Sequence, residues 1–326
     1  MRRRDFTAFV VVGTTMWPFH IHAQSRKVPR IGVLLPGGQV SSSPRTKALL
    51  DGLRVLGYVE GKTIAIEWKW GNDQPDTLPG LAADLVRSNV DVIVTGGTPA
   101  AKALKATTQT TPVVMAVVGD PVAAGLVDNL AHPGGNVTGF SILAPELGTK
   151  RLELLKEIVP NLSSIAVMLN PKNPQSKIEM KEMQTAAQAM GLQLRTAEVS
   201  TEGELEDAFV AMSKANAQAL ILLTDSIFFS ERKRTVDLAS KYKLPAMYFF
   251  QIFVEEGGLM SYGPSDADLF RRAAGYVDRI LKGARPGELP VEQPTKFDLY
   301  INTRTAKTLG VTIPESFVAR AAKVIE

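Results

Sequence analysis

The segment DVIVTGGTPAAKALKATTQTTPVVMAVVGDP, residues 91–121, contains two strand patterns separated by one helix pattern. Asp91–Thr95 and Val113–Val118 are short apolar runs of the kind that form buried strands. Ala100–Ala106, between them, is typical of a short helix. A strand, a helix and a second strand in this order predict a βαβ unit, in which the two strands are parallel.

The same alternation extends outward from this segment and then begins again. It runs through residues 30–118 from a strand pattern at Arg30–Leu35, and a second series covers residues 164–248 from Ser164–Leu169. Alternating strands and helices favour parallel sheets covered on both faces. At ~150 residues per domain, a chain of 326 residues holds about two domains. We therefore predict an α/β fold with two Rossmann-like lobes joined by a hinge.

Composition excludes several classes of function. The chain is 45% hydrophobic and 21% charged, as ordinary globular proteins are. Its net charge is +4, of which Arg2–Arg4 and Asp5 contribute +2, and the small remainder argues against a nucleic-acid surface. The absence of cysteine rules out disulfides, thiolate metal sites and cysteine nucleophiles.

Catalytic and cofactor motifs are also missing. Two of the three histidines, His20 and His22, precede the first strand pattern, so a histidine metal cluster is excluded and a Ser-His-Asp triad would have to use His132. No G-x-G-x-x-G follows the first strand, and no Walker A loop occurs. The sequence predicts a binding protein without catalytic residues, cofactor or metal, and not an enzyme.

The first residues are typical of an export signal. Arg2–Arg4 are basic, residues 6–19 are apolar but too short to span a bilayer with ease, and Ala23 is a small residue at a cleavage point. We expect residues 1–23 to be removed near Ala23, by the Sec or the twin-arginine route. Because no lipoprotein cysteine is present, we expect an unanchored protein in a Gram-negative periplasm.

Residues at the strand ends are candidates for ligand binding, because ligands bind beyond the carboxyl ends of parallel strands. In the first half, Thr98 and Asp120 each precede a proline, a pattern typical of a helix start, and helix capping alone would explain these pairs. Gly37 and Gly97 let backbone N–H groups approach a small ligand closely. Helix N-termini favour an anion such as a carboxylate.

The second half offers side chains of a different kind. Asn170 and Asn173 follow its first strand pattern, and Asn173 also precedes a proline. Asp225 lies at a strand end, where it would receive an ammonium group or cap a helix. Tyr248 and the two phenylalanines after it would form a stacking wall or belong to the core.

Several motifs together resemble the ABC-transporter substrate-binding protein family, whose members include tryptophan- and tyrosine-type binding proteins. The resemblance covers nearly all of residues 28–326. The motifs are Gly97-Thr98-Pro99-Ala100, Gly119-Asp120-Pro121-Val122, HPGGNVTG at 132–139, KRLELL at 150–155, NPKNP at 170–174, GGLMSYG at 257–263 and QPTKF at 293–297.

This resemblance implies a type I periplasmic-binding-protein fold that closes by hinge motion on a ligand in the cleft between the lobes. It also implies a membrane permease and an ATPase encoded separately. The positions that it implies for the cleft are Gly97, Thr98, Asp120 and Ser141 in the first lobe, and Asn170, Asn173, Asp225 and Tyr248 in the second. The expected ligand is a small polar-ended molecule: an amino acid, aromatic ones included, or an aromatic or organic acid.

Turn chemistry suggests where the lobes divide. We expect residues 24–141 with 263–326 to form the first lobe and residues 142–262 to form the second, in a monomeric protein. Within this division the lobe of residues 285–326 stays open. Import is the leading function. Two alternatives stay open, namely a sensor that presents its bound solute to a chemoreceptor or sensor kinase, and a two-lobed enzyme that uses Asp120 and Asp225.

Overall fold

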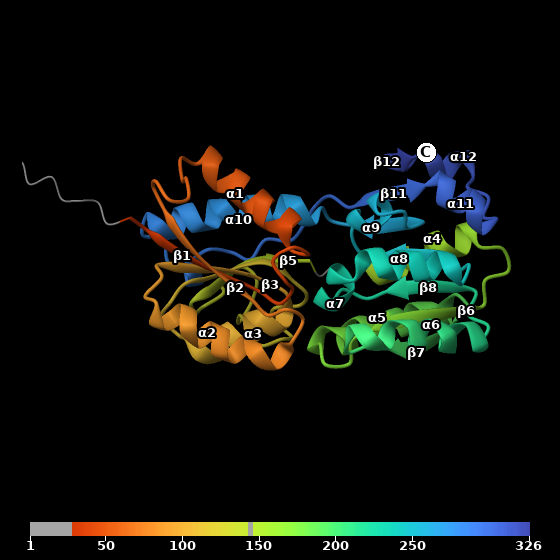
Figure 1. Cartoon of the computed structure of the whole chain (residues 1–326), viewed down its shortest axis with the longest axis horizontal. Coiled ribbons are helices and arrows are strands. Elements are labelled where there is room, and N and C mark those ends of the chain that lie inside the picture. The colour runs from red at the N-terminus through yellow and green to blue at the C-terminus, as the bar shows by residue number, and fades with distance from the viewer. Residues whose placement is uncertain (1–27, 143–145) are drawn as a thin grey trace, which may run out of the picture.

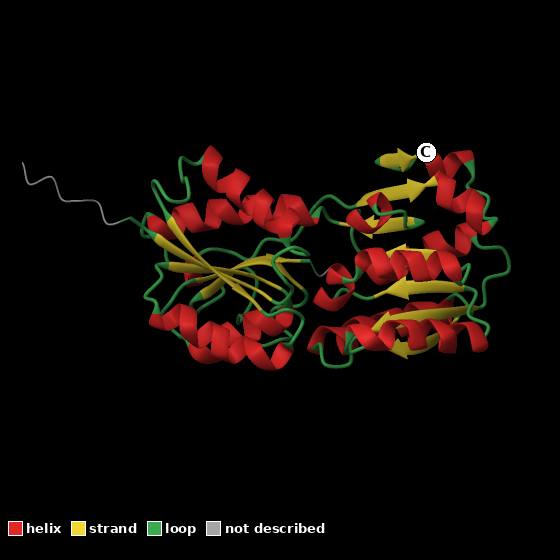
Figure 2. Ribbon diagram, in the orientation of Figure 1, coloured by secondary structure: helices red, strands yellow, loops and turns green. Residues whose placement is uncertain are grey.

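A computed structural model describes residues 28–142 and 146–326, which form two α/β lobes arranged end to end (Figure 1). The predicted leader, residues 1–23, lies outside the described residues. Each lobe is built on one sheet with helices packed against it (Figure 2). The predicted fold class, with mainly parallel sheets in two lobes, is therefore confirmed.

The first lobe contains a five-stranded parallel sheet in the order β2-β1-β3-β4-β5. Its strands are β1 (Arg30–Leu35), β2 (Ala65–Trp70), β3 (Val92–Gly96), β4 (Val113–Val118) and β5 (Val137–Ser141). Its helices are α1 (Ser43–Val55), η1 (Pro75–Thr77), α2 (Leu78–Arg87), α3 (Thr98–Thr107), α10 (Asp266–Leu281) and η3 (Pro286–Glu288).

The pleat of the strands divides the first lobe into two cores. Ile31 and Val33 of β1 pack on the face covered by α1 and α10, whereas Leu34 packs on the face covered by α2 and α3. Both faces are buried, which explains why β1, β3 and β4 are continuous apolar runs rather than alternating ones.

The second lobe contains a seven-stranded sheet in the order β12-β11-β10-β9-β8-β6-β7. Its strands are β6 (Ser164–Leu169), β7 (Gln193–Glu198), β8 (Ala219–Leu222), β9 (Ala246–Tyr248), β10 (Met260–Gly263), β11 (Asp298–Asn302) and β12 (Lys323–Ile325). Its helices are α4 (Glu146–Ile158), α5 (Pro174–Ala189), η2 (Glu202–Glu204), α6 (Leu205–Lys214), α7 (Ser226–Ser230), α8 (Arg232–Lys241), α9 (Ile252–Glu255), α11 (Thr303–Leu309) and α12 (Glu315–Val318).

Five strands of each lobe follow one order. Read from β7, the second sheet runs β7-β6-β8-β9-β10, which repeats the β2-β1-β3-β4-β5 order of the first. In both sheets the order reverses beside the first strand of the lobe, so a crevice opens at the carboxyl ends of β1 and β3 and of β6 and β8. The repeated pattern expected for the two halves is thus present in the topology.

The C-terminal part of the chain is divided between the lobes. Residues 263–284 were expected in the first lobe and the lobe of 285–326 was left open; α10 and the segment around η3 pack on the first lobe. β11 pairs antiparallel with β10, Met260 opposite Ile301, and β12 pairs with β11. Leu299 and Ile301 of β11 are buried in the second core, which explains why this strand covers the edge of the second sheet.

Candidate functional site

Two adjoining cavities lie between the lobes, at the carboxyl ends of the strands. Their empty volumes, including the space at their mouths, are about 510 and 470 Å³. The wall that they share contains Gly119 and Ile142 from the first lobe and Gln175, Glu179 and Thr224 from the second. We call the one that also contains Arg151 the first cavity and the one that also contains Asp225 the second cavity.

The first lobe contributes mostly backbone to the second cavity. Gly97 precedes α3 with a φ of 88°, and a Cβ there would come close to Pro36. Thr98 is buried, and its hydroxyl accepts a hydrogen bond from the Gly119 N–H at 3.4 Å. No side chain caps α3, so its N-terminus, with the positive end of the helix dipole, borders the second cavity.

The second lobe contributes a buried polar cluster centred on Asp225. One carboxylate oxygen accepts hydrogen bonds from the Asn170 amide at 3.2 Å and the Ile227 N–H at 3.0 Å, and the other accepts from Asn173 at 2.8 Å. Burial raises the pKa of the Asp225 carboxyl, against the effect of these three donors. Asp225 and Asn173 line the second cavity, and they also cap α7 and α5.

Three predicted site residues lie behind the cavity walls rather than on them. The Asp120 carboxylate accepts hydrogen bonds from the N–H groups of Val122 and Ala123, both at 2.9 Å, so it shapes its own turn. Ser141 is fully buried and donates to the Gly119 carbonyl at 2.7 Å. Gly37 lies against Ser230 of the other lobe, where the lobes touch.

Tyr248 belongs to the core of the second lobe, which corrects its predicted place in the cleft. Its ring stacks on Phe253 at a centroid distance of 4.9 Å, and burial raises the pKa of its hydroxyl. Beyond β9 the chain turns, and Phe250, two residues later, lines the first cavity. Of this aromatic cluster, Phe250 rather than Tyr248 lines the cavity.

Sequence reasoning missed two ionisable side chains of the first cavity, the buried Arg151 and the half-buried Glu179. Arg151 of α4 donates through Nε to the Tyr262 carbonyl at 2.9 Å, and Glu179 of α5 lies near it. Burial raises the pKa of the Glu179 carboxyl to about 7, against the effect of the Arg151 charge. Burial also lowers the pKa of Arg151, which the Glu179 charge opposes.

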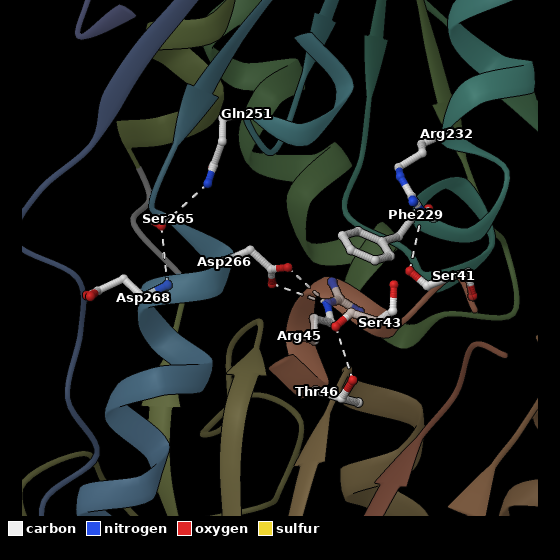
Figure 3. A network of polar contacts seen from close by, with 10 residues as sticks. All are labelled: Ser41, Ser43, Arg45, Thr46, Phe229, Arg232, Gln251, Ser265, Asp266 and Asp268. Carbon is white, nitrogen blue, oxygen red and sulfur yellow. Dashed lines mark hydrogen bonds and ion pairs between the residues drawn. The ribbon is translucent and has the colours of Figure 1, made fainter. Parts of the chain in front are cut away.

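Arg45 is the other missed residue, and it connects the lobes. Its Nε donates to both carboxylate oxygens of Asp266, at 3.0 and 3.3 Å, and its guanidinium carbon lies 3.6 Å from the centroid of the Phe229 ring in the second lobe. Figure 3 shows Arg45 held between these two residues. Both Arg45 and Gln175 directly follow a polar residue and a proline, Ser43-Pro44 and Asn173-Pro174. The position after such a pair was therefore the sequence feature that could have identified Arg45 and Gln175.

Contacts between the lobes show that the structure is closed. The Ser230 hydroxyl donates to the Ser41 hydroxyl at 3.1 Å. Arg232 donates to the Ser41 carbonyl at 3.3 Å (Figure 3). The Asp120 N–H donates to Gln175 Oε1 at 2.9 Å. In the described part of the chain, no helix is both long and apolar enough to span a membrane, and no cluster of three metal-ligating side chains occurs.

Comparisons with known proteins agree with this architecture. The ABC transporter substrate binding protein family matches residues 32–325. A tyrosine-binding protein of Clostridioides difficile is 28% identical over 88% of this chain and 82% of its own length.

Two solved structures resemble the chain over 91% of its length. One is the ABC domain from Streptococcus pneumoniae in complex with L-Trp, with 31% identity, 99% of its own chain covered and a TM-score of 0.85. The other is the ligand-free, open structure of a Clostridium difficile substrate binding protein with adhesive properties, with 26% identity, 99% coverage of its own chain and a TM-score of 0.65. The chain thus superposes better on the tryptophan complex than on the open form.

Proposed function

The chain belongs to the ABC transporter substrate-binding protein family, and we propose that it captures an aromatic amino acid between its lobes for import. The observation that carries this proposal is the difference between the two adjoining cavities. The second cavity is lined by hydrogen-bonding groups of both lobes, whereas the first combines apolar side chains with the ionisable side chains of Arg151 and Glu179. An aromatic amino acid has the same division between its polar backbone end and its ring.

The second cavity suits the backbone atoms of an amino acid. Its ammonium group would lie toward Asp225 and Glu179, where burial strengthens the attraction between opposite charges. Its carboxylate would lie toward the start of α3, where Gly97 and Thr98 offer backbone donors and the helix dipole favours an anion. Asp225 acts in part through Asn170 and Asn173, because its oxygens already accept their hydrogen bonds.

The first cavity suits an aromatic side chain. Ile142, Leu147, Met183 and Phe250 supply apolar contacts. Arg151 and Glu179 are placed to meet a polar group on the ring, such as an indole N–H or a phenol. The ligands named for the relatives, tyrosine and L-Trp, are of this class and support the proposal.

Titration calorimetry of the purified protein tests the ligand class. The panel holds L-tryptophan, L-tyrosine, L-phenylalanine and L-leucine, with tryptamine and indole-3-propionate as analogues that lack one polar end. We expect the aromatic amino acids to bind and both analogues to bind at least ~10-fold more weakly, because a lost charge-assisted hydrogen bond costs ~1.5–3 kcal/mol. Binding of neither L-tryptophan nor L-tyrosine would contradict the proposed ligand.

A pair of variants tests the site. Asp225→Ala is expected to weaken L-tryptophan binding by ~10- to 100-fold, because it removes the acceptor that orders Asn170 and Asn173. Asp207→Ala, an exposed acid of the same lobe, is the matched control and should leave affinity unchanged. Equal affinities for the two variants would remove Asp225 from the site.

Import is proposed on the basis of the family, with a separate permease and ATPase as partners. Deletion of the gene should reduce uptake of the labelled amino acid by cells. A sensor would instead lose the response to that amino acid while uptake continued, which separates the two functions.

A further inference from the structure

The side chain of Gln175 reaches from the second lobe to the backbone of the first. Gln175 is 2% exposed, in the first turn of α5, and its Oε1 accepts a hydrogen bond from the Asp120 N–H at 2.9 Å. A backbone N–H can be satisfied only by an acceptor, so this contact fixes which end of the amide is oxygen. Gln175 is therefore a direct hydrogen-bonded bridge between the lobes.

The nitrogen end of the same amide is buried without a partner. Gln175 Nε2 has no hydrogen-bond partner among the described residues. The Gln175 side chain acts on the Glu179 carboxyl as a hydrogen-bond donor that lowers its pKa, but the contact falls outside the geometry of a formed hydrogen bond. Buried donors are almost always paired, and an unpaired one is unfavourable. Because Gln175 lines both cavities, a bound molecule can reach this donor.

Gly119 makes room for this bridge. A Cβ at residue 119 would overlap Cδ and Oε1 of Gln175. The backbone of Gly119 does not have the positive φ that favours glycine, so the space taken by Gln175 is the reason for glycine here. An added methyl group would therefore oppose closure and leave the backbone of the first lobe unstrained.

We propose that Gln175 couples ligand binding to lobe closure: its oxygen holds the Asp120 N–H of the other lobe, and its nitrogen donates to an acceptor oxygen of the ligand. This inference rests on the proposed function, because it requires that a small molecule occupies the cavities. The two ends of one planar amide thereby bind the ligand and the Asp120 N–H of the first lobe. The hydrogen bond to Asp120 forms only in the closed form, where the same amide also donates to the ligand.

Closure can be measured without ligand by a disulfide trap. The chain has no cysteine, so Ser41→Cys with Ser230→Cys introduces the only two thiols, at a contact where the hydroxyl oxygens are 3.1 Å apart across the lobes. The rate of cross-linking under mild oxidation then reports the fraction of closed molecules. In this background Gly119→Ala is expected to slow cross-linking by ~10-fold or more. Gly80→Ala, where a Cβ meets nothing within 4 Å, is the matched control.

A second substitution, Gln175→Ala, is expected to change the cross-linking rate in opposite directions in the two backgrounds. Gln175→Ala alone is expected to slow cross-linking, because it removes the hydrogen bond to Asp120. In the Gly119→Ala background the same substitution should speed cross-linking, because it removes the overlap. Cross-linking of Gly119→Ala at the wild-type rate would overturn the bridge. If Gly119→Ala fails to fold, judged by thermal melting, an unchanged rate for Gln175→Ala alone would overturn it equally.

The contact with the ligand is tested by calorimetry with L-tryptophan. If Gln175 acted on closure alone, Gln175→Ala would lower the apparent affinity by the same factor by which it lowers the closed fraction. The reason is that apparent affinity scales with the fraction of molecules competent to bind. We expect Gln175→Ala to lower affinity by ~5-fold or more beyond that factor. Equal factors would overturn the ligand contact.

The two proposals fail in different ways. If wild-type protein binds no aromatic amino acid, the proposed ligand is wrong, while the trap still reports the bridge without any ligand. If L-tryptophan binds wild-type protein and Gly119→Ala equally well, the proposed function stands and the coupling is wrong.

Discussion

The two lobes place different chemistry at equivalent points of the same topology. In the first lobe the strand ends supply Gly97, Thr98 and Gly119, which act mainly through backbone groups and the start of α3. In the second lobe the equivalent strand ends supply Asp225 and Asn173, whose side chains form a buried hydrogen-bonded cluster. The strand order is shared, but the groups that face the ligand space are not.

This difference suggests a division of labour. A cluster of side chains that hold one another, as Asp225 holds Asn170 and Asn173, keeps its geometry whether or not the other lobe is present. Glycine and backbone groups form a surface that can close tightly over a molecule already held. We therefore expect the second lobe to determine which ligand is bound and the first lobe to determine how completely it is enclosed.

The largest expected effect concerns Arg45. This residue is the exception to the comparison, because it is a charged side chain that the first lobe places at the second cavity. Arg45→Met should destabilise the protein by ~3–5 kcal/mol, because it leaves the buried Asp266 carboxylate without its ion-pair partner. Urea denaturation measures the loss.

Two further variants distinguish a role of Arg45 in supporting the fold from a role in binding the ligand. Arg54→Met removes an exposed ion pair on the same helix and should cost less than ~1 kcal/mol. Arg45→Met combined with Asp266→Asn should recover most of the stability. If the double variant is stable and binds L-tryptophan with wild-type affinity, Arg45 supports the fold, and the first lobe contributes no charged group to recognition. A loss of affinity in that stable variant would make Arg45 a ligand-binding residue and break the comparison.

The second prediction concerns a charge in the second lobe. Burial raises the pKa of Glu179 from an ordinary 4.5 to about 7, so the folded protein holds this proton more tightly than the unfolded chain. The contribution of Glu179 to the free energy of unfolding should therefore be greatest below pH 4.5 and decrease as pH rises to about 7. The loss is at most a few kcal/mol, since one pKa unit corresponds to ~1.4 kcal/mol.

Glu179→Gln isolates this contribution. Asp73, whose pKa is raised to about 6 by burial, is present in both proteins, so the comparison between them cancels its titration. Urea denaturation at pH 5 and pH 7.5 should show the variant gaining stability over wild type at the higher pH only. An equal difference at both pH values would mean that Glu179 is ionised throughout, held by the Arg151 charge.

Much of the fold was predictable from the sequence, because strand and helix patterns are local properties. Residues 91–121 form β3, α3 and β4 as expected, and the two series of alternating elements became two sheets of matching order. The placement of β11 was not predictable, because its pattern shows that it is a strand but not which sheet edge it covers. That depends on the burial of Leu299 and Ile301 against a core built from distant segments.

The site was predictable where it follows strand ends and not where it lies on helices. Thr98 begins α3, Asn173 and Asp225 cap helices, and all three line the second cavity. Arg151 and Glu179 lie inside α4 and α5, where a charged residue ordinarily faces solvent. Their place in the cavity wall depends on the lobes and on β10, which the local sequence does not encode.

The smallest expected effect concerns the aromatic residues of the second lobe. Tyr248→Phe should change L-tryptophan affinity by less than ~2-fold and stability by less than ~0.5 kcal/mol, because the ring keeps its stacking on Phe253 and only the hydroxyl is lost. Phe250→Leu, two residues along the chain, should weaken binding measurably, because that ring lines the first cavity. Calorimetry of both variants compares a core ring with a cavity ring. A clear loss of affinity for Tyr248→Phe would return Tyr248 to the ligand site and extend the second lobe's part in recognition to its core aromatic cluster.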